Sequence, residues 1–173
     1  MVKIIGGQWK RKNIFFYEQD GLRPTLGRVR ETVFNWLGQD LRGKSCLDLF
    51  SGSGALGFES LSRGADSCVF VEKNKLVYET LKKNKLDLNA EKAEVVHSDA
   101  KEFLKNNSLC FDVIFYDPPF NDKDNTALLD SLAIYLRQNG CIYLETRNRY
   151  SGPGYKIFKE SHAGQVYFYL LTK

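Results

Sequence analysis

The chain has 173 residues, of which 43% are hydrophobic and 27% charged, and this fits one domain with a sizeable core. It has no apolar run of about 18 residues and no apolar stretch at its start, so we expect a cytoplasmic protein, neither membrane-spanning nor secreted. Its net charge of +4 is uneven, because residues 1–44 hold nine Lys/Arg against four Asp/Glu, and residues 45–173 hold 16 against 17. The excess in the first quarter favours a surface for a polyanion, although a solvated basic surface would have the same composition.

The first 44 residues differ in character from the rest, and we treat them as an N-terminal extension of a domain formed by residues 45–173. Residues 2–5 and 13–17 are predicted to pair as short strands around a basic turn. A helix is predicted to follow Thr25, which is suited to an N-cap. The apolar residues that follow at helical spacing are Leu26, Val29, Val33 and Leu37.

From residue 45 onward, short apolar runs alternate with segments that have helical patterns. This alternation predicts a parallel sheet covered by helices on both faces, which is a doubly wound α/β fold. The expected strands are residues 45–50, 67–71, 93–97, 111–116 and 141–145. The expected helices are residues 55–62, 75–88, 100–106 and 125–138.

The pattern changes after Gly152-Pro153-Gly154. Residues 155–159 and 165–172 flank a polar stretch and are predicted to form an antiparallel hairpin. The hairpin would complete a mostly parallel, seven-stranded sheet. Such a hairpin is unusual in nucleotide-binding dehydrogenases and usual in the methyltransferase version of the Rossmann-like fold.

The four cysteines are far apart, show no CxxC spacing and stand at or just before apolar runs. They are Cys46, Cys68, Cys110 and Cys141. We therefore expect no metal site, and we interpret the four as small buried hydrophobic residues in a reducing compartment.

A glycine-rich loop follows the first expected strand of the domain. Residues 52–57 read Gly-Ser-Gly-Ala-Leu-Gly, a GxGxxG motif between a strand and a helix, whose glycines allow a tight turn and close approach of a ligand. Glu72 ends the next strand, where an acid can hold both hydroxyls of a ribose. These features alone fit a dinucleotide as well.

Two further acids favour S-adenosylmethionine as the cofactor. Asp48 lies before the glycines, where it can meet the cationic methionine end, and Asp99 follows the third strand, where it can accept from the adenine amino group. A pyrophosphate would prefer positive surroundings. The structural alternatives are an N-cap role for Asp99 and a surface position for Glu72. The predicted cofactor-binding residues are Asp48, Phe50, Ser51, Gly52, Gly54, Glu72, Asp99 and Ala100.

The sequence Asp117-Pro118-Pro119-Phe120 follows the apolar run 111–116, and so stands at the carboxyl end of a predicted strand. Two prolines fix φ and remove two backbone donors, so the motif offers a carboxylate and carbonyls that only accept hydrogen bonds. An aromatic ring stands beside them. Such a motif suits the exocyclic amine of a flat ring, although a turn that ends a strand is the structural alternative.

With these pieces together, the chain resembles a class I S-adenosylmethionine-dependent methyltransferase. It closely resembles the bacterial RsmD family of 16S ribosomal RNA guanine-N2 methyltransferases over nearly its whole length. The resemblance rests on residues 4–10 (IIGGQWK), 22–25 (LRPT), 28–37 (RVRETVFNWL), 48–57 (DLFSGSGALG) and 117–120 (DPPF). Leu26-Gly27 departs from the family pattern, where Thr-Asp or Thr-Ser is expected.

The resemblance implies a Rossmann-like methyltransferase fold and S-adenosylmethionine as the cofactor. It implies one guanine of 16S ribosomal RNA in the small ribosomal subunit as the substrate, and we expect a monomer. Asp117 and the Pro118 carbonyl would accept the hydrogens of the guanine N2 amine, and Phe120 would stack on the base. The residues expected to contact RNA phosphates are Lys10, Arg11, Lys12, Arg23, Arg28 and Arg30.

Other functions stay open at this point. The nearest is another amino-methyltransferase, which acts on adenine N6 of RNA or DNA or on a different guanine, since the same motif serves any exocyclic amine. A protein glutamine methyltransferase usually carries Asn before Pro-Pro. A nicotinamide oxidoreductase would leave residues 117–120 unexplained. A non-catalytic RNA-binding factor would not need Asp117 and the glycine loop intact.

Overall fold

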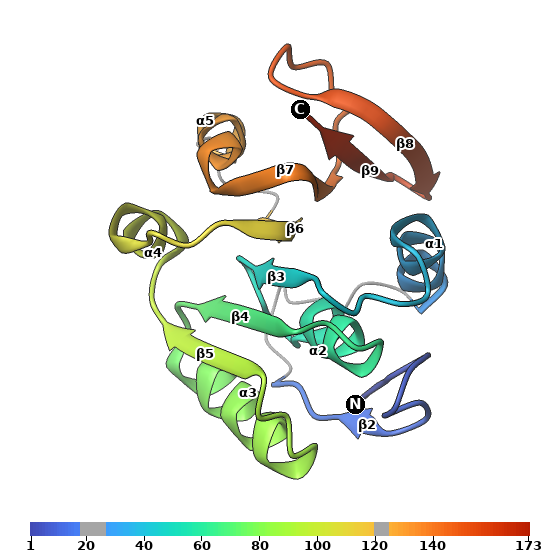
Figure 1. Cartoon of the computed structure of the whole chain (residues 1–173), viewed down its shortest axis with the longest axis vertical. Coiled ribbons are helices and arrows are strands. Elements are labelled where there is room, and N and C mark those ends of the chain that lie inside the picture. The colour runs from blue at the N-terminus through green and yellow to red at the C-terminus, as the bar shows by residue number, and fades with distance from the viewer. Residues whose placement is uncertain (18–26, 120–124) are drawn as a thin grey trace.

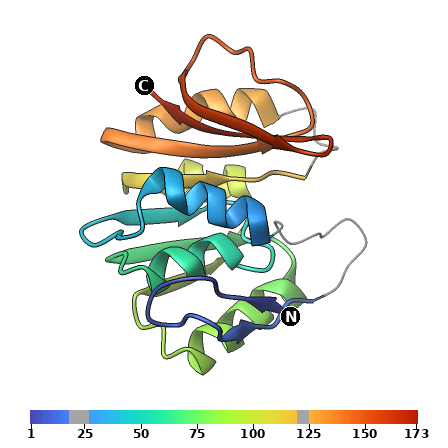
Figure 2. The same ribbon diagram turned by 90° about the vertical axis from the view of Figure 1, so that its right-hand side faces the viewer.

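The computed structural model describes residues 1–17, 27–119 and 125–173. A seven-stranded sheet forms its centre, with helices on both faces (Figures 1 and 2). The helices are α1 (Gly27–Leu37), α2 (Ala55–Ser62), α3 (Lys75–Asp87), α4 (Ala100–Asn106), α5 (Asn125–Ser131) and the 3-10 helix η1 (Leu132–Tyr135). The strands are β1 (Val2–Lys3), β2 (Asn13–Ile14), β3 (Ser45–Asp48), β4 (Ser67–Glu72), β5 (Ala93–His97), β6 (Phe111–Tyr116), β7 (Leu136–Thr146), β8 (Lys156–Ala163) and β9 (Val166–Thr172).

The sheet has the order β5-β4-β3-β6-β7-β9-β8, and its first five strands are parallel. β9 pairs antiparallel with β7 and with β8, so the predicted mostly parallel sheet with an antiparallel C-terminal hairpin is confirmed. The chain runs outward from β3 to β5 and then returns to build β6 and β7 on the other side of β3. Parallel sheets bind ligands at such a reversal, beyond the carboxyl ends of the strands.

Two apolar cores lie on opposite faces of the sheet, because successive side chains of a strand point to opposite faces. On one face, Val113 and Phe115 of β6 pack with α1, α2 and α3. On the other face, Ile114 and Tyr116 pack with α4 and α5. Figure 1 shows the sheet between these two layers. Burial on both faces explains why the central strands read as continuous apolar runs.

The predicted helix 125–138 is wrong in its second half. α5 ends at Ser131, η1 follows, and β7 begins at Leu136, which pairs with Phe111. Asn139 has φ 61°, a left-handed conformation that interrupts a helix, and pairing with β6 outweighs the local helical pattern. The first strand of the C-terminal hairpin is also longer than predicted, since β8 reaches Ala163.

The cysteine prediction holds for two residues only. Cys46 and Cys68 are buried in the core, and Cys141 is partly buried. Cys110 is exposed, because it lies in the loop before β6, which begins at Phe111. None of the helices in the described ranges has the length and apolarity to cross a bilayer.

The N-terminal extension, which includes α1, packs on the face of the sheet that α2 and α3 cover (Figure 2). β1 and β2 form the predicted antiparallel pair, in which Val2 faces Ile14. The side chains of Ile4, Val33 and Phe34 are fully buried and join the core of that face. Burial of such side chains contributes roughly 1.5–3 kcal/mol each, so the extension and the sheet stabilise each other.

Candidate active site

The glycine loop joins β3 to α2 at the carboxyl edge of the sheet. Gly52 and Gly54 have φ of 48° and 73°, which only glycine adopts without strain, and Gly54 is the N-cap of α2. A Cβ at Gly54 would lie 2.6 Å from Leu81 Cδ2, so a side chain there would force its neighbours to shift. Ser51 N–H donates to the Val71 carbonyl (3.1 Å), and its hydroxyl donates to the Asp48 carbonyl (2.7 Å). These bonds fix the position of the loop between β3 and β4.

Glu72 lies directly beside the glycine loop, as the cofactor prediction requires. Its carboxylate accepts from Gly52 N–H (3.1 Å) and from Asn74 N–H (2.8 Å). The side chain is partly buried, and its carboxylate oxygens have lone pairs for further donors. The arrangement therefore suits an acid that receives ribose hydroxyls, and it excludes the surface position that was the structural alternative.

Asp48 is the buried acid of this site. Its side chain is 3% exposed and accepts from Gly57 N–H, the first turn of α2, at 3.1 Å. Burial is the main cause that raises the pKa of Asp48 to about 8; the Gly57 hydrogen bond opposes this shift, and the charge of Glu72 adds to it. A neighbouring cation would favour the ionised form, so the site suits the positive end of a ligand.

We expect Asp48→Asn to change how stability depends on pH. The unfolded-chain pKa is near 3.8 and the folded value is about 8. The wild type therefore loses stability as pH rises between these values, by up to about 1.4 kcal/mol per pH unit, and the amide does not. The measurement is urea unfolding of both proteins without cofactor, from pH 5 to 8. The free energy of unfolding of Asp48→Asn should rise relative to that of the wild type as the pH increases. A difference that does not change with pH would contradict this.

Asp99 and Ala100 stand at the start of α4, beyond the end of β5. Asp99 is exposed and caps the helix, since its Oδ1 accepts from Lys101 N–H at 2.9 Å. The structural alternative for this residue is therefore realised, and a cap leaves lone pairs for an adenine amine as well. The register pairs Glu72 with His97, so Asp99 lies at the same edge of the sheet as the glycine loop.

Asp117 and Pro118 follow β6 at this edge. The register pairs Phe115 with Asp48, so the motif rises beside the glycine loop. The Phe50 ring packs edge-on against Tyr116, with 5.5 Å between the centroids, and so joins the loop to the strand end. Asp117 is partly buried and Pro118 is buried. The structure therefore brings the predicted cofactor loop and the predicted catalytic residues together, while Phe120 lies outside the described residues.

The predicted RNA-contact residues divide into separate groups. Arg28 is exposed on the first turn of α1, and Arg23 lies outside the described residues. Lys10, Arg11 and Lys12 are exposed, in a turn fastened to Ser62, where Gln8 N–H donates to the Ser62 carbonyl at 2.7 Å.

Ser62 ends α2, an eight-residue helix that starts at the glycine loop. It therefore lies about 12 Å of helix away from that loop, near the amino edge of the sheet. The structure does not bring the turn at residues 10–12 together with Asp117.

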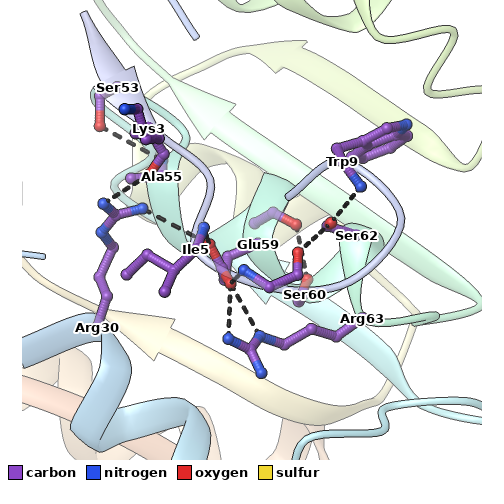
Figure 3. Close-up of polar contacts among 12 residues, drawn as sticks. Lys3, Ile5, Trp9, Arg30, Ser53, Ala55, Glu59, Ser60, Ser62 and Arg63 are labelled. Carbon is purple, nitrogen blue, oxygen red and sulfur yellow. Dashed lines mark hydrogen bonds and ion pairs between the residues drawn. The ribbon is translucent and has the colours of Figure 1, made fainter. Parts of the chain in front are cut away.

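Arg30 is a correction to the RNA-contact prediction. Its side chain is 4% exposed, its Nη2 donates to the Lys3 carbonyl at 2.9 Å, and it forms an ion pair with Glu59 at 3.7 Å. Arg63 approaches the same carboxylate from the other side (Figure 3). Burial lowers the pKa of the Arg30 guanidinium, and Glu59 offsets part of that shift. A residue enclosed in this way joins α1 to α2 and does not face solvent.

Sequence reasoning overlooked two arginines at the carboxyl edge, Arg147 and Arg149, which follow β7 and are exposed. The Arg149 guanidinium lies over the Tyr167 ring, 5.6 Å from its centroid, and His162 packs on the same ring. Thr146 pairs with Tyr167, so the β8–β9 turn lies at this edge too. The charge count of residues 45–173 is near zero, and only the fold shows where its cations gather.

The sheet order, the glycine loop and the strand-end Asp-Pro-Pro together define a Rossmann-like methyltransferase. A family model described as "Conserved hypothetical protein 95" matches residues 2–172. The "Ribosomal RNA small subunit methyltransferase D" of Escherichia coli K12 is 38% identical, over 99% of this chain and 90% of its own length. The Haemophilus influenzae protein of the same name is 40% identical, over 98% and 92%.

A solved structure agrees with these matches. The Escherichia coli protein yhhF superposes with a TM-score of 0.88 at 38% identity, over 98% of this chain and 96% of that one. The chain belongs to the family of ribosomal RNA small subunit methyltransferase D, which is the RsmD family that its sequence resembles.

Proposed function

We propose that this protein transfers a methyl group from S-adenosylmethionine to the exocyclic N2 amine of one guanine in 16S ribosomal RNA. The observation that carries the proposal is the meeting of Asp117-Pro118 with the glycine loop where the strand order reverses. Family members named for ribosomal RNA of the small subunit support the substrate class. The proposed partner is the small ribosomal subunit, the proposed location is the cytoplasm, and the monomeric state stays a prediction.

The cofactor, when bound, supplies an electrophilic methyl group on a sulfonium. Gly52 and Gly54 would let it approach the backbone, Glu72 would hold its ribose and Asp48 its cationic end. Asp99 and Ala100 would meet the adenine. The donor set fits this group, because the acids in the described part of the site suit a cation better than a pyrophosphate.

The chemistry asked of the protein is to activate a poor nucleophile. The lone pair of the guanine amine is delocalised into the ring. Asp117 and the Pro118 carbonyl would accept the two amine hydrogens, which favours a more tetrahedral nitrogen and aims its lone pair at the methyl carbon. The Asp117 carboxylate would stabilise the positive charge that develops on the amine nitrogen as it takes the methyl group from the sulfonium, until that nitrogen gives up a proton. Phe120 would stack on the flipped base.

The test is to incubate the protein with methyl-labelled S-adenosylmethionine and small subunits that lack the modification, then digest the RNA and identify the labelled nucleoside. We expect label in N2-methylguanosine. Label in N6-methyladenosine would favour the second candidate, an adenine amino-methyltransferase, which the same motif permits. Bound cofactor without label in subunits or naked RNA would overturn an RNA substrate.

We expect the cations at the carboxyl edge to hold the phosphates that flank the target base. Arg149→Ala should weaken binding of the small subunit, whichever base is the target, and should lower the slope of log affinity against log salt by about one. The matched control is Lys156→Ala, which removes an exposed cation of β8 at the other end of the hairpin. The measurement is filter binding at several salt concentrations. Equal losses of affinity for the small subunit in both variants would contradict a role for this edge.

A further inference from the structure

A second carboxyl group lies beside the catalytic motif, on β7. Tyr116 of β6 pairs with Leu144 of β7 in parallel register, so Asp117 and Glu145 stand at the next level of the two strands. Phe115 and Tyr143 lie two residues before Asp117 and Glu145. Both point to the α1 face, and their ring centroids are 6.4 Å apart. Side chains alternate along a strand, so Glu145 faces the same side as Tyr143, on a strand about 4.8 Å from β6. Asp117 follows the end of β6, and its charge acts on the Tyr143 hydroxyl.

The surroundings hold Glu145 in one place. The Tyr143 hydroxyl donates to Glu145 Oε2 at 2.7 Å, and the Tyr143 side chain is fully buried. On its other side, Glu145 pairs with Phe168 of β9, which stacks on Trp36 of α1 with 5.4 Å between centroids. Glu145 therefore stands between the catalytic carboxylate and an aromatic stack contributed by the N-terminal helix.

This acid is short of donors. Glu145 is only partly exposed, and it forms no ion pair within the described part of the chain. Burial raises the pKa of Glu145, and burial together with the charges of Glu145 and Asp117 raises that of Tyr143. The Glu145 carboxyl group, partly buried beside a second carboxyl group, is costly to ionise unless a ligand brings N–H groups to it. The cluster matches a ligand edge that only donates.

Guanine has such an edge and adenine does not. Guanine presents N1–H next to its N2 amine, which gives adjacent donors, whereas adenine presents a bare N1 acceptor next to its N6 amine. A carboxylate beside Asp117 would accept from guanine N1–H and would repel the lone pair of adenine N1. Sites built to pair with a donor reject analogues that lack it far more strongly than apolar pockets reject a change of size.

We propose that Glu145 reads the Watson–Crick edge of the target base by accepting its N1–H, and that it thereby makes guanine, not adenine, the substrate. Asp117 and the Pro118 carbonyl keep the N2 hydrogens. Tyr143 is a positioning residue, which orients the Glu145 carboxylate without touching the base. The proposal rests on the proposed function and gives the site its base specificity.

The test compares two substrates at the mapped target position, guanosine and 2-aminopurine riboside, in small subunits reconstituted with the substituted RNA. 2-Aminopurine keeps the amine that is methylated and lacks N1–H. We expect the wild type to prefer guanosine at least 100-fold in kcat/KM. Glu145→Gln should narrow this ratio at least tenfold, because its amide can donate to N1 of 2-aminopurine. Glu145→Asp keeps a carboxylate and should keep the preference at a lower rate.

The controls separate this proposal from the proposed function. If the wild type puts no label on guanosine, the proposed function fails, whatever Glu145 does. Glu94→Gln makes the same change at an exposed position of β5 and should leave the ratio unchanged. Tyr143→Phe should lower kcat on guanosine and leave cofactor affinity unchanged. A Glu145→Gln protein that slows both substrates equally would overturn the proposal, since a purely structural residue would act in that way. A Glu145→Asp protein that loses the preference for guanosine would overturn it as well.

Discussion

Asp117→Ala should reduce methyl transfer at least about 10³-fold and change the affinity for S-adenosylmethionine by no more than a few-fold. The variant loses the acceptor that aligns the amine and the charge that stabilises the transition state, and removing one preorganised electrostatic partner typically costs about 10²–10³ in kcat. Alignment of the amine is lost as well. The measurements are transfer of labelled methyl to small subunits and calorimetric titration of the cofactor.

Two controls accompany this variant: a conservative substitution at Asp117 itself, and the removal of an exposed carboxylate elsewhere on the surface. Asp117→Asn keeps a carbonyl acceptor and loses the charge, so its rate should lie between those of the alanine variant and the wild type. Asp87→Ala removes an exposed carboxylate at the end of α3 and should leave the rate unchanged. A folded Asp117→Ala protein that no longer binds the cofactor would move Asp117 from catalysis into the cofactor site.

The sequence predicts most of the Rossmann-like part because its signals are local. β5, α4 and β6 have the predicted bounds, since apolar runs of strand length stand next to a side chain that caps the following helix, as Asp99 does for α4. The helix prediction fails for residues 132–138 because pairing with β6 decides their structure. Helical periodicity carries no information about such a contact across the sheet.

The same distinction applies to the site. The glycine loop and Glu72 are found from spacing, because one strand–helix–strand unit, β3-α2-β4, brings Gly52 N–H within 3.1 Å of the Glu72 carboxylate. Arg30 is assigned wrongly because a charge count cannot show that Glu59, 29 residues further along, encloses it. The positions of Glu145 and Arg149 follow only from the fold. The strand register places Glu145 at the level of Asp117, and Arg149 lies over the Tyr167 ring.

Glu59→Ala should destabilise the protein by roughly 3–5 kcal/mol, the loss expected when one partner of a buried ion pair is removed. Glu59 is fully buried, and its carboxylate accepts from the backbone N–H groups of Ile5 and Gly6, both at 2.8 Å. It also accepts from Arg63 Nε at 2.9 Å and faces Arg30. Without it, two buried guanidinium groups lose their counter-charge. The Nε and Nη1 atoms of Arg30 already make no hydrogen bond within the described part of the chain.

The measurement is urea unfolding beside Glu79→Ala, which breaks an exposed pair with Lys82 on α3 and should cost no more than about 1 kcal/mol. Equal losses in the two variants would show that the buried carboxylate adds nothing beyond an exposed one. Hydrogen exchange gives a local readout, because the amides of Ile5 and Gly6 lose their acceptor in Glu59→Ala and should exchange faster than those of the sheet. Since the same carboxylate holds α1 through Arg30, its loss should loosen the helix that carries Arg28 and Trp36 while the glycine loop at the start of α2 keeps its bonds to β3 and β4.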